Sequence, residues 1–232
     1  MSQQKSEDFM NLEEFRNRYS DASETLFKDG IEYSVLGNET QDEYDLLADY
    51  YDVFMREEFG WYPEYIIPII RKFVFPHQLI LDAGVGTGLI GQELARYNYK
   101  RLWGIDISTQ MLEKAKTDGN YECLNWADLY KPLAFEDNFF DAIISIGVLI
   151  HVNHPQLLRE FLRVTKRGGH IILANRIDRF RAFGFMDEAE KMTNEGLWKS
   201  LYHNIKNYCT NMTEYINTPD LHYTEDVYQV LE

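Results

Sequence analysis

A short apolar run followed at once by alternating glycines constrains this chain more than any other stretch. Residues 79–81 have the length and composition of a buried central strand of a parallel sheet. The glycines that follow, Gly84, Gly86 and Gly88, allow positive φ angles or close approach of the backbone to a ligand. Apolar side chains at helical spacing over residues 89–97 predict a helix after the turn, with Thr87 as its N-cap. Because the open amide end of that helix faces the turn, we expect a ligand here.

The region after this turn alternates strand and helix patterns. Its predicted elements are strands at 101–107, 121–124, 140–147 and 170–174, and helices at 108–116, capped by Ser108, and at 155–164, with a turn at Gly168 and Gly169. This alternation predicts an α/β fold, a Rossmann-like doubly wound sheet with helices on both faces. Further on, residues 186–197 look helical, and 198–209 could pair with 225–231 as antiparallel strands.

An acidic segment and two predicted helices precede the central strand. Residues 1–40 are polar, acidic and weakly periodic, so we expect a mobile arm. Apolar and aromatic side chains recur at helical spacing over 41–59, and Pro68 should kink or shorten a second helix over 63–73. We therefore predict one domain over residues 41–232, with a helical lid over 41–75.

Charge and cysteine content limit the classes of partner. The chain has 232 residues and a formal net charge of −15, from 23 Lys and Arg against 38 Asp and Glu. Such a charge repels phosphate backbones and anionic lipid, so nucleic acid and membrane surfaces are disfavoured partners. The two cysteines, Cys123 and Cys209, lie in no zinc-binding pattern, so no metal site is predicted. No secretion leader and no apolar run of 18 residues is evident, and a cytoplasmic location is expected.

The glycines alone leave the ligand open. Residues 86–91 also fit the G-x-G-x-x-G dinucleotide fingerprint, with Asp106 at the expected distance, so an NAD-dependent oxidoreductase is one alternative. Asp82, at the strand tip, would repel a pyrophosphate but attract an ammonium or a sulfonium. Asp106 and Asp128 end the next two strands, where they can accept hydrogen bonds from a ribose diol and an adenine amino group. Three carboxylates at successive strand ends favour an adenosyl sulfonium.

Four segments in order resemble the motifs of class I S-adenosylmethionine-dependent methyltransferases. They are LDAGVGTG at 81–88, GIDISTQML at 104–112, FDAI at 140–143 and RVTKRGG at 163–169, and the likeness covers about residues 44–175. A narrower likeness, to the Williams-Beuren-region methyltransferase-like proteins, rests on residues 44–52, 195–198 and 227–230. Arg167 departs from the proline that usually precedes the double glycine, which affects loop shape more than chemistry.

The resemblance implies a seven-stranded sheet whose last strand is antiparallel, with S-adenosylmethionine as cofactor and S-adenosylhomocysteine as product. It places Asp82 and the glycines near the methionine part, Ile107 and Met111 against adenine, and Leu129 with Asp128 at the adenine edge. The complete set of expected cofactor-binding residues is Asp82, Gly84, Val85, Gly86, Gly88, Asp106, Ile107, Met111, Asp128, Leu129 and Ile146.

Methyl transfer from a sulfonium is an in-line displacement, so the protein must mainly align the reactants and exclude water. His151 is the candidate general base because it follows the fourth strand, although a histidine here is often structural in this family. The residues expected at the lid and acceptor are Tyr50, Tyr51 and Trp61, together with Asn175 and Arg176, which could bind an acceptor carboxylate or amide.

The leading hypothesis is a methyltransferase with a small-molecule acceptor. The alternatives are a protein-substrate methyltransferase and a noncatalytic protein that only binds S-adenosylmethionine. Residues 145–148 (SIGV) stand where enzymes that methylate base amines carry Asn-Pro-Pro-Tyr or Asp-Pro-Pro-Tyr, so nucleic acid bases are disfavoured acceptors. The sequence does not indicate an oligomeric state.

Overall fold

The computed structural model describes residues 41, 44–45, 47–58, 60–117, 120–207 and 222–231. The chain divides into two units, 1–35 and 36–232, and all the described residues belong to the second unit. The arm expected over residues 1–40 lies outside the described residues. Among the described helices, none combines the length and apolar character needed to cross a bilayer.

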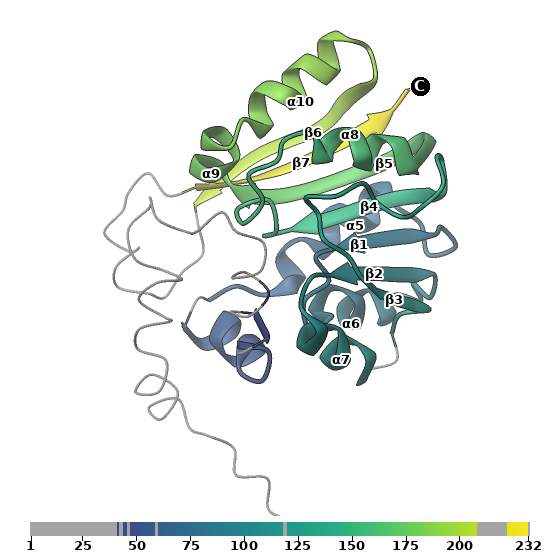
Figure 1. Ribbon diagram of the computed structural model, residues 1–232. Helices are drawn as coiled ribbons and strands as arrows, with labels where there is room; N and C mark the ends of the chain where they lie inside the picture. Colours follow the sequence, from purple (N-terminus) through teal and green to yellow (C-terminus); the bar gives the residue numbers. More distant parts are fainter. Residues whose placement is uncertain are drawn as a thin grey trace, which may run out of the picture. The chain divides into compact units, whose positions relative to one another are not determined.

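Seven strands of the described residues form one sheet, in the order β3-β2-β1-β4-β5-β7-β6 (Figure 1). The strands are β1 Ile80–Ala83, β2 Leu102–Asp106, β3 Cys123–Trp126, β4 Phe140–Ile146, β5 Thr165–Arg176, β6 Trp198–Asn207 and β7 His222–Val230. Strands β1 to β5 are parallel, whereas β7 runs antiparallel to both β5 and β6. The predicted α/β sheet with an antiparallel last strand is confirmed.

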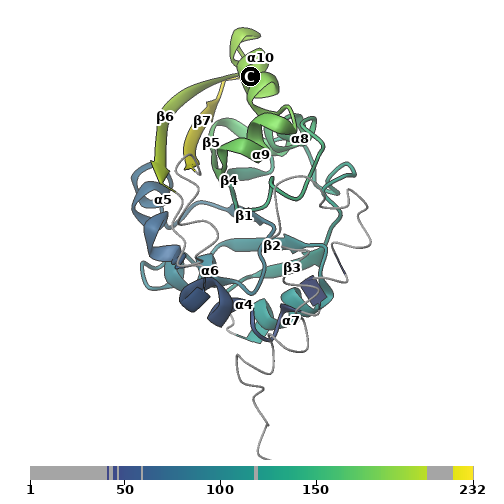
Figure 2. The same cartoon turned by 90° about the vertical axis from the view of Figure 1, so that its left-hand side faces the viewer.

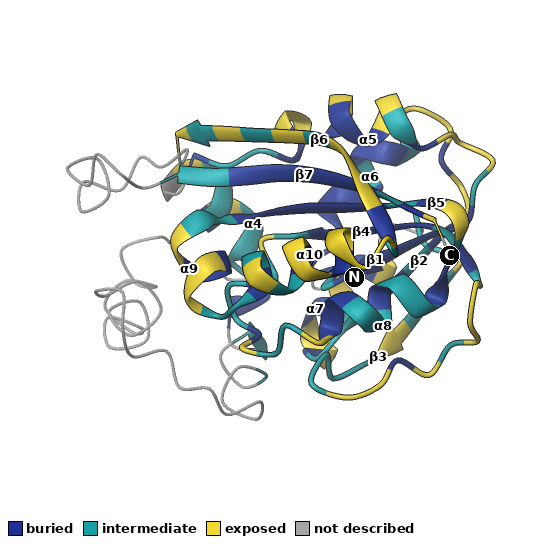
Figure 3. Ribbon diagram, turned by 90° about the horizontal axis from the view of Figure 1, so that it is seen from above, coloured by how far each residue is buried: buried dark blue, intermediate teal, exposed yellow. Residues whose placement is uncertain are grey.

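Helices cover both faces of the sheet (Figure 2). Helices α5 (Ile67–Phe73) and α6 (Leu89–Ala95) bury isoleucine and leucine side chains against one face. Helices α8 (Leu157–Val164), α9 (Ile177–Ala182) and α10 (Phe185–Asn194) cover the other face, and α7 (Thr109–Thr117) packs beside β2 and β3. Strand β7 is mostly buried, whereas exposed and half-buried residues alternate along most of the neighbouring β6 (Figure 3).

Three strands begin two or more residues away from their predicted limits. Strand β7 begins at His222 rather than at residue 225. Strand β3 begins at Cys123 rather than at residue 121, because the ring of Tyr121 turns under the glycine turn and its hydroxyl binds Asp82. Strand β5 begins at Thr165, directly after α8, so the double glycine forms a bulge within the strand instead of a turn before it. Gly168 permits this bulge with φ +77°.

The lid region also differs from its predicted form. The continuous helix expected over 41–59 is wrong: the backbone turns at residues 48–50, continues as α4 (Tyr51–Val53) and then forms a π-helical segment, η1 (Phe54–Glu58). The effect of Pro68 is confirmed, because a 3₁₀ turn, η2 (Pro63–Tyr65), precedes α5 and Pro68 lies in the first turn of α5.

Other helix predictions met mixed outcomes. Ser108 caps α7, since its Oγ accepts the N–H of Met111 at 3.0 Å. Thr87 does not cap α6; its hydroxyl donates to Asp52, and Gly88 with φ +89° occupies the cap position. The predicted helix over 186–197 is α10, and α9 was not predicted.

Phe140 is fully buried, and its ring contacts the rings of Trp103, Phe135 and Phe139. We expect Phe140→Ala to lower the free energy of unfolding by about 3–5 kcal/mol, because the lost ring leaves a cavity. Phe75→Ala is the matched control, since that ring is 56% exposed, and its effect should stay below about 0.5 kcal/mol. Urea denaturation measures the free energy of unfolding of both variants. Equal losses in the two would contradict the assignment of Phe140 to the core.

Candidate functional site

The glycine turn lies between β1 and α6. Gly84 has φ +83°, and a Cβ added there would lie 2.3 Å from Cγ2 of Val148, so a side chain does not fit. Gly86 has φ +53°, and an added Cβ would meet only the ring of Tyr51, at 3.9 Å. The backbone at Gly86 therefore borders open space.

Asp106 ends β2 and holds this turn in place. Its Oδ2 accepts the N–H of Gly86 at 2.8 Å, and its Oδ1 accepts the N–H of Ser108 at 2.9 Å. Burial raises the pKa of Asp106, although these N–H groups oppose that rise. Because each carboxylate oxygen has two lone pairs, both can accept a further hydrogen bond from a ligand.

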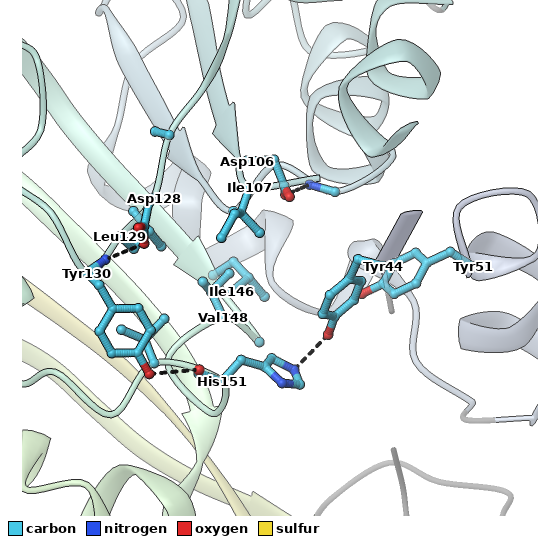
Figure 4. Close-up of a pocket in the computed structure, with 15 residues that line it drawn as sticks. Tyr44, Tyr51, Asp106, Ile107, Asp128, Leu129, Tyr130, Ile146, Val148 and His151 are labelled. Carbon is cyan, nitrogen blue, oxygen red and sulfur yellow. Dashed lines mark hydrogen bonds between the residues drawn. The ribbon is translucent and has the colours of Figure 1, made fainter. Parts of the chain in front are cut away.

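A pocket of about 710 Å³, counting its open mouth, lies at the carboxyl ends of β1 to β4 (Figure 4). The residues that line it are Tyr44, Tyr51, Gly84, Gly86, Asp106, Ile107, Ala127, Asp128, Leu129, Tyr130, Ile146, Gly147, Val148, His151 and Val152. Nine of these are among the site residues expected from the sequence.

The other expected residues lie outside the pocket lining. Val85 and Met111 are buried behind the turn, and Gly88 begins α6. Tyr50 is half-buried, and Trp61 packs against the core cluster under α5. Asn175 and Arg176 end β5: the amide oxygen of Asn175 accepts the N–H of Leu149, and Arg176 pairs with Asp178 at 2.7 Å.

Asp82 also lies outside the pocket lining, and its carboxylate is bound by Tyr121. The hydroxyl of Tyr121 donates to its Oδ2 at 2.8 Å and accepts the N–H of Gly91 at 3.0 Å. Burial raises the pKa of Asp82 to about 7; the Tyr121 hydrogen bond opposes this rise and the charge of Asp106 adds to it. Tyr121 thereby connects β1 to α6 below the glycine turn.

Elsewhere in the pocket lining, one aromatic residue of the lid region, Tyr44, contacts His151. The hydroxyl of Tyr44 lies 2.7 Å from Nε2 of His151, and the rings of Tyr44 and Tyr51 are neighbours (Figure 4). The pKa of His151 is lowered to about 4, first by burial and then by the charges of Arg179 and Arg176, so its imidazole is neutral near pH 7.

Three aspartates attach the lid region to the site. Asp45 accepts the hydroxyl of Ser108 at 2.5 Å and the N–H of Gln110 at 3.0 Å. Asp49 pairs with Lys114 at 2.6 Å, and Asp52 accepts the hydroxyl of Thr87 at 2.5 Å. The lid region is thus fixed to both the start of α7 and the glycine turn.

Six lining residues were not predicted: Tyr44, Ala127, Tyr130, Gly147, Val148 and Val152. Tyr44 could have been predicted from the sequence, because helical spacing places it on the same face as Tyr51. Tyr130 follows Leu129, and its hydroxyl accepts the N–H of Asn153 at 2.9 Å. The part of the chain that the structure describes holds no group of three or more His, Cys, Asp or Glu suited to a metal ion.

Comparison with known proteins identifies the central region. Residues 81–173, which run from β1 to β5 and include most of the pocket lining, match the family described as "Methyltransferase domain". This segment is a methyltransferase domain. The class I methyltransferase recognised in the sequence is thereby confirmed, together with S-adenosylmethionine as the cofactor of that class.

Two curated relatives and one solved structure are similar to this domain. Methyltransferase-like protein 27 from Homo sapiens is 39% identical over 103 residues, which cover 44% of this chain and 42% of that protein. A ubiquinone/menaquinone biosynthesis C-methyltransferase from Geotalea daltonii is 29% identical over 149 residues, 59% of this chain and 63% of that protein. The match therefore spans about half the length of these relatives.

The solved structure shares the fold of the methyltransferase domain. It is a SAM-dependent methyltransferase from Methanosarcina mazei, with a TM-score of 0.56 and 20% identity, which covers 71% of this chain and 97% of that chain. The human relative agrees with the narrower likeness to the Williams-Beuren-region proteins.

The raised pKa of Asp82 predicts a specific dependence of stability on pH. Its folded pKa of about 7 lies above the ordinary value of 3.8, so the native state binds the proton more tightly. Asp82 therefore stabilises the fold below about pH 4, and this contribution, up to about 4 kcal/mol, is lost as the pH rises through 7.

We expect Asp82→Asn, which keeps the hydrogen bond from Tyr121, to remove this dependence. Relative to the variant, the wild-type protein should lose free energy of unfolding between pH 5 and pH 8 in urea titrations. Parallel profiles of the two proteins would show that Asp82 ionises normally.

Proposed function

We propose that this chain transfers a methyl group from S-adenosylmethionine to a small-molecule acceptor. The observation that carries the proposal is the carboxylate of Asp106, which lines the pocket from the end of β2 while it holds the glycine turn. A carboxylate in this place accepts hydrogen bonds from a ribose diol.

The residues of the pocket fit the cofactor. Gly86 presents backbone without a side chain to the open space, as close approach of a ligand requires. Ile107 and Leu129 offer apolar surface for a nucleoside base. Asp128 at the end of β3 is held by the N–H of Tyr130 at 3.0 Å and by Lys131 at 3.1 Å, which leaves its carboxylate able to accept from an adenine amino group.

When bound, S-adenosylmethionine supplies an electrophilic methyl group and its own leaving group. The protein has to align the acceptor and exclude water. Asp106 and Tyr51 lie beside the glycine turn, while Tyr44 and His151 line another part of the pocket. The neutral imidazole of His151 is held by Tyr44 and can accept a proton, although a pKa of about 4 makes it a weak base at neutral pH.

Two observations support a small acceptor. Tyr44 and Tyr51 line the pocket together with apolar side chains such as Ile107 and Leu129, a lining typical of small-molecule sites. The relative from Geotalea daltonii is named for ubiquinone and menaquinone biosynthesis, and these quinones are small molecules. An S-adenosylhomocysteine complex without turnover in an acceptor screen would favour the noncatalytic alternative.

Removal of the Asp106 carboxylate tests the proposal. We expect Asp106→Ala to weaken binding of S-adenosylmethionine and S-adenosylhomocysteine by about 1.5–3 kcal/mol, the usual value of hydrogen bonds to a charged group. Asp187→Ala, on the exposed face of α10, is the matched control and should bind normally. Calorimetry measures both variants, with NAD as the competing ligand class. Unchanged affinity in Asp106→Ala, or tighter binding of NAD, would contradict the proposal.

The lid assignment can be tested with two adjacent tyrosines. Tyr51 lines the pocket beside Gly86, whereas Tyr50 does not. We expect Tyr51→Ala to weaken S-adenosylhomocysteine about tenfold through lost apolar contact, and Tyr50→Ala to leave the affinity unchanged. Equal effects of the two substitutions on the dissociation constant would count against a lid formed by Tyr51.

A further inference from the structure

Asn175, at the carboxyl end of β5, has a buried side-chain amide that forms a hydrogen bond through its oxygen but not through its nitrogen. Asn175 is 2% exposed, and its Oδ1 accepts the N–H of Leu149 at 3.2 Å. Its Nδ2 has no hydrogen-bond partner among the described residues. A buried donor without an acceptor costs about 1–3 kcal/mol, so this amide group is suited to an acceptor atom that those residues do not provide.

A second buried polar atom without a partner lies on the neighbouring strand, β7. Thr224 pairs with Asn175 in the antiparallel register of β7 and β5, so both side chains project from the same face. Oγ1 of Thr224 is also buried without a partner in the described part of the chain. Leu173, on this same face, packs in one cluster with Val152, which follows His151. The two polar atoms therefore lie on the side of the sheet that carries the His151 loop.

Two arginines follow Asn175 in the chain. Arg176 ends β5, and Arg179, which is 7% exposed, lies on the following helix α9 (Figure 1). Both arginines lower the pKa of His151, so their positive potential reaches the imidazole. Asp178 pairs with Arg176 at 2.7 Å. Asp226, a buried carboxylate on the same face of β7 as Thr224, lies 2.6 Å from Nδ1 of His203. The end of the pocket formed by β2 and β3 is lined by carboxylates.

We propose that the methyl acceptor carries a carboxylate, which binds at the end of β5 through Nδ2 of Asn175, with the hydroxyl of Thr224 and the guanidinium of Arg179 as further donors. This inference rests on the proposed function and specifies the chemical class of its acceptor. Hydrogen bonds from such donors to a carboxylate are about twice as strong as those to a neutral group. A carboxamide of the same shape would offer one acceptor oxygen and no charge, so the site distinguishes the two.

Calorimetry on the full chain saturated with S-adenosylhomocysteine tests this inference. The probes are acetate, propionate and benzoate, each compared with its own carboxamide. We expect at least one carboxylate to bind about tenfold or more tightly than its carboxamide. Asn175→Asp keeps the oxygen that faces Leu149 but replaces the donor with a second acceptor, so it should weaken that carboxylate by about tenfold or more. Asn98→Asp, in an exposed turn, makes the same chemical change and should have no effect.

Equal affinity for carboxylates and carboxamides, no carboxylate binding at millimolar concentration, or unchanged binding by Asn175→Asp would each overturn the inference. The preceding titration with S-adenosylhomocysteine tests the proposed function separately. If that ligand binds and carboxylates do not, only the acceptor class is wrong. If Asn175→Asp does not fold, as judged by circular dichroism, Thr224→Val replaces it, and we expect carboxylate binding to weaken several-fold without a change for the carboxamide.

Discussion

The hydrogen bond from the N–H of Gly86 to Oδ2 of Asp106 is the interaction on which the site depends. It joins the turn after β1 to the end of β2, and the second oxygen of the same carboxylate receives the N–H of Ser108 at the start of α7. Ser108 in turn donates to Asp45 in the lid region. One buried carboxylate therefore positions the turn, the start of the next helix and, through Ser108, the segment around Asp45.

This arrangement places two buried carboxylates in one small region. Asp82 and Asp106 both have raised pKa values, and the charge of Asp106 adds to the rise at Asp82. They are stabilised differently: Asp106 accepts backbone N–H groups, whereas Asp82 faces the neutral hydroxyl of Tyr121. With a pKa of about 7, Asp82 is partly protonated near neutral pH, which reduces the repulsion between the two carboxylates.

The sequence predicted the sheet and much of the pocket lining, because the carboxyl ends of neighbouring parallel strands meet at one edge. Gly86, Asp106 and Asp128 lie at that edge for this reason. The orientation of Asp82 could not be predicted, since it depends on Tyr121 from a distant part of the chain. Helical spacing over 41–59 likewise identified an aromatic face, but the break at residues 48–50 accompanies aspartate contacts with α7 and the glycine turn. The binding roles of the expected residues stay predictions.

The attachment of the lid region has a consequence for how such a chain can evolve. Three aspartates of this segment each bind a residue that comes much later in the chain. Asp45 binds Ser108, Asp49 binds Lys114 and Asp52 binds Thr87. An insertion or deletion between these aspartates would shift at least one of them away from its partner. We therefore expect related chains to conserve the spacing of this segment more strictly than its composition, and to exchange the residues of each pair together.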